Sequence, residues 1–74
     1  MTKKHKALAT AFSEGSPCRI TYRDRSKRWT TRDVRIETLA RDHIVARCEL
    51  RGGSYRRFNL RDLSRAELLR PSIP

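Results

Sequence analysis

The residues of this chain with the clearest chemical potential are its arginines. The 18 basic residues comprise 14 Arg and 4 Lys against 8 Asp and Glu, which gives a formal net charge of +10 in 74 residues. A guanidinium is a planar cation whose fixed donors match phosphate and carboxylate oxygens. We therefore expect a polyanionic partner, with nucleic acid first and a nucleotide second. The alternative is that these arginines only form a solvated surface.

Two arginines interrupt the apolar faces of the strands predicted to hold them. Arg32 and Arg56 both align with apolar neighbours in a period-two pattern. An unpaired guanidinium is costly to bury. Each must therefore line the rim of a pocket for an anion or pair internally with an acid such as Glu49 or Asp62, unless its face is misassigned. We favour the rim pocket.

Aromatic residues accompany these cations. Tyr22 and Phe58 either fill the core or place a ring or a hydroxyl beside a phosphate or a base. Trp29, the only Trp, either stacks on a base or packs against the N-terminal helix. A base stacked on an aromatic ring contributes roughly 1–3 kcal/mol in proteins that bind single strands. Aromatic rings beside a basic groove therefore indicate a single-strand binding surface.

Motifs for catalysis and metal binding are absent from the sequence. It contains no glycine-rich phosphate loop, no HExxH and no GxSxG. Cys18 and Cys48 form no CxxC pair, and zinc needs about four ligands. We expect no enzymatic activity, no metal and no cofactor, and we interpret both cysteines as small buried hydrophobic residues.

Length and composition indicate one small domain spanning residues 1–74. The hydrophobic fraction of 36% is enough for one small core. No apolar run approaches the roughly 18 residues that a membrane span requires. The basic N-terminus is not followed by an apolar signal core, so we expect a cytoplasmic protein without membrane contact.

The N-terminal segment 2–14 is predicted to form an amphipathic helix. Leu8, Ala11 and Phe12 fall on one helical face, and Gly15 fits the stop position. The lysines of the first turn lie at the unfavourable end of the helix dipole. We expect them to contact a polyanion rather than to stabilise the helix.

From residue 18 the hydrophobic period changes to two, which is typical of strands. The pattern predicts strands at 18–23, 28–37, 43–50 and 55–60. A polar turn, a short connection and a glycine-containing turn at 51–54 separate these strands, in that order.

The last segment, 65–69, fits two structures. Ser64 and Glu67 have capping-box spacing, which favours a helix, while the alternation of apolar residues allows a short strand. A barrel needs its last strand to pair with an early one, so we favour the strand. The predicted fold is mainly β, a small five-stranded barrel over about residues 17–70 behind an N-terminal helix.

Short motifs along the chain resemble those of a known family. An I-x-Y pattern occupies 20–22 within the segment 15–23, R-x-V occupies 32–34, an L-V-A-like triplet occupies 44–46, and R-x-F-x-L occupies 56–60. In this order, over about residues 7–69, they resemble a WYL domain.

Some positions depart from the WYL pattern. Asp42 and His43 stand where the family has the Trp and Tyr of its name. Ile36 replaces the Pro that usually follows R-x-V. Arg61 and Asp62 reverse the usual Asp-Arg order, so Arg61 replaces the family's last pocket cation only if the backbone redirects it.

The resemblance implies an Sm-like β-barrel with an N-terminal helix. It also implies a bacterial or phage regulatory module that binds nucleic acid or nucleotide-type ligands and controls an attached effector. Carried over by position, its basic and aromatic patch contains Tyr22, Arg32 and Arg56, with Arg57 and Arg61 beside them. These 74 residues leave no space for a helix-turn-helix before the first helix, so we expect a stand-alone module or one that acts on a partner protein.

The predicted partner is single-stranded DNA or RNA, or a nucleotide ligand. The alternative is a protein-interaction module that forms a homodimer through sheet edges or docks to an acidic partner such as a nuclease or a transcription complex. The predicted binding residues are Tyr22, Arg23, Trp29, Arg32, Arg56, Arg57 and Arg61.

Overall fold

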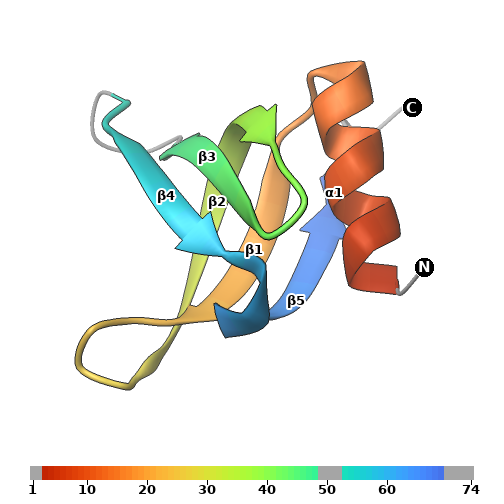
Figure 1. Ribbon diagram of the computed structural model, residues 1–74. Helices are drawn as coiled ribbons and strands as arrows, with labels where there is room; N and C mark the ends of the chain where they lie inside the picture. The colour runs from red at the N-terminus through yellow and green to blue at the C-terminus, as the bar shows by residue number, and fades with distance from the viewer. Residues whose placement is uncertain (1–2, 49–52, 70–74) are drawn as a thin grey trace.

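A computed structural model of the chain describes residues 3–48 and 53–69, which form one helix and one antiparallel sheet (Figure 1). The mainly β fold with an N-terminal helix is therefore confirmed. The elements are α1 (Lys3–Glu14), β1 (Cys18–Arg23), β2 (Trp29–Leu39), β3 (His43–Cys48), β4 (Tyr55–Asn59), the 3-10 helix η1 (Leu60–Asp62) and β5 (Leu63–Leu68).

The five-stranded sheet is open. Its strand order is β4-β3-β2-β1-β5, so β4 and β5 form the two edges. As predicted, the last strand pairs with an early one: β5 lies antiparallel to β1, with Leu68 opposite Cys18. Closure would also require β4 to pair with β5, but η1 lies between them in the chain and no such pairing occurs in the described residues. A barrel is therefore not confirmed.

Most predicted boundaries agree with the structure to within two residues. The segment 65–69, for which helix and strand were both considered, belongs largely to strand β5. Residue 2, residues 49–52 and residues 70–74 lie outside the described residues. The glycine turn predicted at 51–54 is therefore described only in its second half, where Gly53 has a φ of 81°.

Helix α1 ends at Glu14, directly before Gly15, as the sequence predicts. Gly15 adopts a φ of 69°, and the backbone N–H of Ser16 donates to the carbonyl of Ala11 at 3.0 Å. This 6→1 bond is the Schellman arrangement, in which glycine relieves the cost of left-handed backbone. The Arg35 guanidinium donates to the Gly15 carbonyl and ties β2 to the helix end. In the described part of the chain, no helix combines the length and apolar character needed to cross a bilayer.

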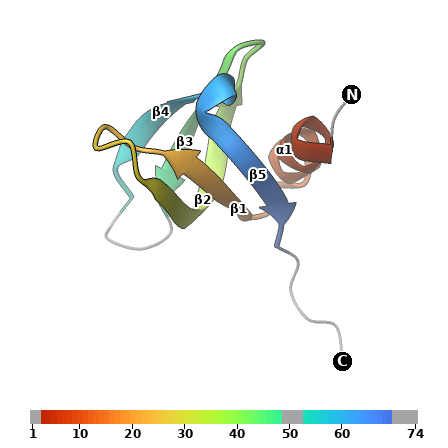
Figure 2. The same cartoon turned by 90° about the horizontal axis from the view of Figure 1, so that it is seen from below.

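The core joins the inward residues of the sheet to a narrow stripe of α1, which packs against β5 and β2 (Figures 1 and 2). Period-two alternation puts every second strand residue on this side. The buried set is Leu8, Ala11, Cys18, Ile20, Tyr22, Val34, Ile44, Ala46, Phe58, Leu60 and Leu63.

The helical stripe is narrower than the sequence pattern predicts. Leu8 and Ala11 are buried as expected, but Phe12 is 45% exposed. Phe12 shares their general face, yet the curved sheet covers only the part of α1 that faces β5 and β2. The predicted apolar face of the helix is therefore buried only in part.

Lys4 has a structural role that the sequence analysis did not predict. Its Nζ donates to the carbonyl of Leu60 at 3.0 Å and to that of Leu63 at 2.8 Å. These carbonyls flank η1, so a single ammonium ties α1 to the connection between β4 and β5. The expectation that the first-turn lysines contact a polyanion is therefore wrong for Lys4.

Replacing Lys4 with methionine is expected to destabilise the domain by about 1–3 kcal/mol, because two partly buried carbonyls lose a charged donor. Lys3→Met is the matched control, since Lys3 is exposed one residue earlier on the same helix. Urea unfolding measures both. Equal midpoints for the two variants would contradict the structural role of Lys4.

The two cysteines should differ in reactivity. Both are free thiols, but Cys18 is fully buried, and burial raises its pKa to about 11. Cys48 is half-buried. We expect Cys48 to react with a thiolate-directed reagent in the folded protein at neutral pH, and Cys18 to react only after unfolding. Peptide mapping that finds Cys18 labelled first would contradict this order.

Candidate anion-binding site

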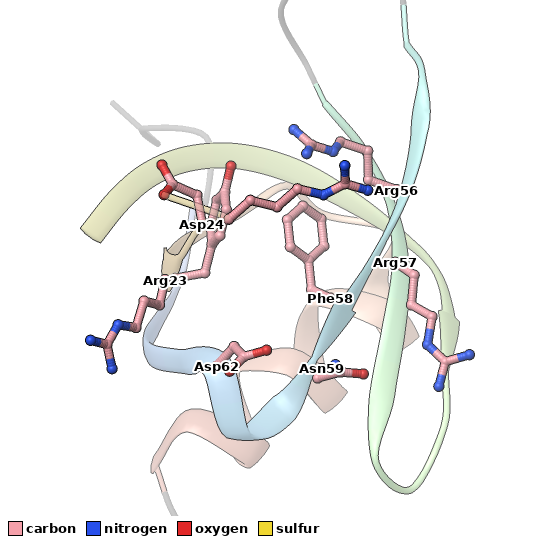
Figure 3. Close-up of a pocket in the computed structure, with 9 residues that line it drawn as sticks. Arg23, Asp24, Arg56, Arg57, Phe58, Asn59 and Asp62 are labelled. Carbon is pink, nitrogen blue, oxygen red and sulfur yellow. The ribbon is translucent and has the colours of Figure 1, made fainter. Parts of the chain in front are cut away.

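An open pocket of about 430 Å³ lies between β4 and the end of β1 (Figure 3). We call it the main pocket. Four arginines and two aspartates line it, so its side chains are cationic overall. The complete lining is Tyr22, Arg23, Asp24, Arg25, Arg56, Arg57, Phe58, Asn59 and Asp62.

Two aromatic rings form the apolar part of the main pocket. The centroids of Tyr22 and Phe58 are 4.8 Å apart, and their planes meet at 62° in an edge-to-face contact. Their strands, β1 and β4, are separated in the sheet by β2 and β3. Sheet curvature therefore brings these rings together, and the linear pattern of the sequence does not contain that information.

Arg56 lies over this aromatic pair. Its Cζ is 6.0 Å from the ring centroid of Phe58, and both side chains belong to the inner side of β4 (Figure 3). Within residues 3–48 and 53–69, Arg56 makes no hydrogen bond or ion pair that would occupy its donors. Asp62, one of its predicted acidic partners, lines the same pocket, while Glu49 lies outside the described residues. The Arg56 side chain is exposed and lines the main pocket.

Arg32 is placed differently from the prediction. Its Nε donates to the Tyr22 hydroxyl at 3.0 Å, and this bond, followed by one to the thiol of Cys48, raises the pKa of Arg32. Its surroundings form a separate pocket of about 300 Å³, lined by Arg19, Thr30, Thr31, Arg32, Asp33 and Cys48.

The structure places Arg32 and Arg56 in the linings of two different pockets. It connects them indirectly: Arg32 holds the Tyr22 hydroxyl, Tyr22 contacts Phe58, and Arg56 lies over Phe58. Arg32 is a positioning residue for the phenol. Among the described residues, Arg32 has the Tyr22 hydroxyl and the Cys48 thiol as partners, and neither is a carboxylate.

Arg23 and Trp29 form a pair where the β1–β2 hairpin turns. They are directly opposite each other in the sheet, and the Cζ of Arg23 is 6.0 Å from the Trp29 ring centroid. The turn between β1 and β2 lies at the end of these strands that is remote from α1 in both views (Figures 1 and 2). Trp29 is 60% exposed. The alternative in which it packs against the helix is therefore excluded, and its ring is open to stacking.

Asp24 organises the turn that carries two of the pocket arginines, Arg23 and Arg25. Its Oδ1 accepts hydrogen bonds from the backbone of Ser26 and Arg28, at 2.8 and 3.0 Å. The bond from the Arg28 backbone is the main cause of its lowered pKa, so the carboxylate is ionised at neutral pH. Because it is used to hold the turn, this carboxylate pairs with neither arginine in the described structure.

Arg57 and Arg61 line a second pocket of about 440 Å³, which we call the side pocket. Arg57 leaves β4 on the side opposite Phe58 (Figure 3), as neighbouring strand residues do. Its Cα partner on β3 is Val45. The complete lining is Asp42, Arg57, Asn59, Leu60 and Arg61.

Two other arginines of the sheet, Arg19 and Arg65, form ion pairs with carboxylates. Arg19 forms a two-bonded ion pair with Asp33, at 2.8 and 3.2 Å, and its hydrogen bond lowers the pKa of Asp33. The Nη2 atom of Arg65 lies 3.0 Å from the Oε1 atom of Glu67. Such exposed pairs add little stability, but they reduce the cationic character of that face relative to the main pocket.

Several residues that line the main pocket were not predicted as binding residues from the sequence. Asp24 and Arg25 were interpreted only as a polar turn, and Asn59 was not selected. Both residues directly follow Tyr22 and Arg23 in the sequence, and this adjacency could have placed them in the predicted site. No comparable signal existed for Asn59, because the curvature of the sheet determines that it lines the same pocket as residues of β1.

Comparison of the chain with protein families, with curated proteins and with solved structures gave no match in any of the three.

Proposed function

We propose that this protein is a small regulatory module that binds single-stranded nucleic acid, or a nucleotide-like anion with the same phosphate and base chemistry, in the main pocket. The observation that carries the proposal is the guanidinium of Arg56, which lies over the Phe58 ring of the Tyr22–Phe58 pair and has no hydrogen-bond or ion-pair partner among the described residues. A cation beside aromatic rings offers a phosphate and a base their preferred contacts in one place.

The surroundings of the pocket favour the same ligand. Arg23 and Arg25 face it from the hairpin, and exposed Trp29 lies under Arg23. Exposed aromatic residues beside arginines are typical of single-strand binding surfaces, since every base has a face that can stack.

A WYL-type module with an Sm-like barrel remains part of the proposal. The N-terminal helix, the antiparallel strands and the pairing of β5 with β1 support it. The motif positions Tyr22 and Arg56 line one pocket, and Arg32 is bonded to the Tyr22 hydroxyl.

Binding of fluorescent oligonucleotides at several salt concentrations tests the proposal. We expect single strands to bind more tightly than the matching duplex. The plot of log affinity against log salt should have a slope of roughly −0.7 per phosphate neutralised. Equal affinity for both forms, or an affinity independent of salt, would overturn the proposed function.

The second candidate function, a protein-interaction module, is supported by the two open edges of the sheet. In the described structure, neither β4 nor β5 has a neighbour on its outer side. Unpaired edges can add a strand from another chain, so a homodimer or docking to an acidic protein would use them. Light scattering that gives a monomer at all concentrations would exclude the dimer, and pull-down before and after nuclease treatment separates protein docking from nucleic-acid bridging.

A further inference from the structure

The main pocket and the side pocket share a wall. Arg57 and Asn59 line both, and they alternate with Phe58 along β4. Residues two apart on a strand point to the same side. The two pockets have similar volumes, about 430 and 440 Å³. Both volumes fall within the range of about 300–1,000 Å³ typical of small-ligand sites.

We propose that the ligand is an oligonucleotide rather than a single nucleotide, and that it crosses β4 at this wall. One nucleotide occupies the main pocket, the next occupies the side pocket, and Arg57 binds the phosphate that joins them. This inference rests on the proposed function and specifies its substrate class.

The side pocket differs chemically from the main pocket. No aromatic ring lines it among the described residues; instead it presents two guanidiniums, from Arg57 and Arg61, with the Asn59 amide between them. An amide both donates to and accepts from base edges, and guanidiniums bind phosphates. We therefore assign stacking to the main pocket, and phosphate contact with base-edge hydrogen bonding to the side pocket.

A backbone hydrogen bond joins two of the residues that line the side pocket, Leu60 and Asp42. The backbone N–H of Leu60 donates to the Asp42 carbonyl at 2.9 Å, which joins the β2–β3 connection to η1. The Asp42 side chain lies 2.7 Å from Nδ1 of His43, and this bond is the main cause of its lowered pKa. An ionised carboxylate therefore lines the pocket beside Arg57 and Arg61 and repels a phosphate bound there.

Arg61→Gln is the first test. The two probes are a single nucleotide and a short single-stranded oligonucleotide. We expect affinity for the oligonucleotide to fall about tenfold and affinity for the nucleotide to stay unchanged, because only the oligonucleotide reaches the side pocket. The salt slope for the oligonucleotide should become shallower by roughly 0.7, the value for one phosphate on a single strand. Arg41→Gln is the matched control, since Arg41 is exposed, carries the same charge and lines neither pocket.

Asp42→Asn tests the same site in the opposite direction. Removal of the negative charge should tighten oligonucleotide binding by roughly threefold, while the amide retains a partner for His43. Nucleotide binding should not change.

The outcomes separate the inference from the function on which it rests. If the parent protein binds the nucleotide as tightly as the oligonucleotide, or if Arg61→Gln affects both probes equally, the two-pocket path is wrong and the main-pocket function stands. If the parent protein binds neither probe, the proposed function itself fails. Thermal unfolding of each variant identifies any loss of binding that comes from misfolding.

Discussion

Alanine at position 56 is expected to lower the affinity for a single-stranded oligonucleotide by about tenfold to a hundredfold, since a hydrogen bond to a charged group contributes roughly 1.5–3 kcal/mol. Arg56 lies at the rim of the main pocket, over the Phe58 ring, and has no competing partner in the described residues. Its removal therefore takes away a phosphate contact without breaking an internal bond, and the unfolding midpoint should stay close to that of the parent.

Arg47→Ala is the matched control for this prediction. Arg47 is an exposed arginine on β3, and its neighbour Ala46, which is buried, lies opposite Arg56. Arg47 therefore points to the other face of the sheet. Both variants lose one positive charge, so a general electrostatic attraction would weaken equally in both. Equal losses of affinity would remove the main pocket from the account and leave only the net charge.

Arg56→Lys adds information on the geometry of the contact. Lysine keeps the charge but lacks the planar fork of donors that a phosphate accepts in pairs. Binding intermediate between that of the parent and that of Arg56→Ala would indicate a two-bonded contact.

Leu8→Ala is expected to destabilise the domain by about 2–5 kcal/mol, the usual range for a buried leucine. Leu8 is 0% exposed and is one of two residues through which α1 is buried against the sheet. A domain of this length has a total stability of roughly 4–11 kcal/mol, estimated from its size. This one substitution therefore removes a large part of the stability, and a substantial fraction of the protein should be unfolded at physiological temperature.

Phe12→Ala gives the contrast. Phenylalanine is larger than leucine, but Phe12 is 45% exposed. The cost should be below about 1 kcal/mol, since partly exposed side chains leave little cavity behind. Urea unfolding of the two variants compares them directly. A larger loss for Phe12→Ala than for Leu8→Ala would show that the helix packs in another orientation.

Much of the fold was predictable because local patterns encode it. Period-two alternation locates the strands, and Gly15 locates the end of the helix. The contacts of Lys4 were not predictable, since its acceptors lie 56 and 59 residues away in the chain and are backbone carbonyls that any sequence supplies. The predicted closure of the sheet was not confirmed for a related reason. The 3-10 helix η1 (Leu60–Asp62) follows β4, and no local pattern in the sequence indicated this helix.

The candidate site was predictable in part. Strand parity correctly placed Arg56 on the side of Phe58, and it correctly grouped Arg32 with the inner residues of β2. Parity does not say which pocket a side chain enters. That depends on twist and curvature, which direct Arg32 toward the Tyr22 hydroxyl and Arg56 toward the Phe58 ring.

Mapping by NMR is the most direct test of the main pocket as the binding site. A protein of 74 residues permits assignment of its amide and arginine side-chain signals during titration with a short single-stranded oligonucleotide. We predict that the largest shift changes occur at Tyr22, Arg23, Arg56 and Phe58, with little change at Arg19 and Arg47 on the opposite face. Changes concentrated at Arg19 and Arg47, or spread evenly over all arginines, would contradict the assignment.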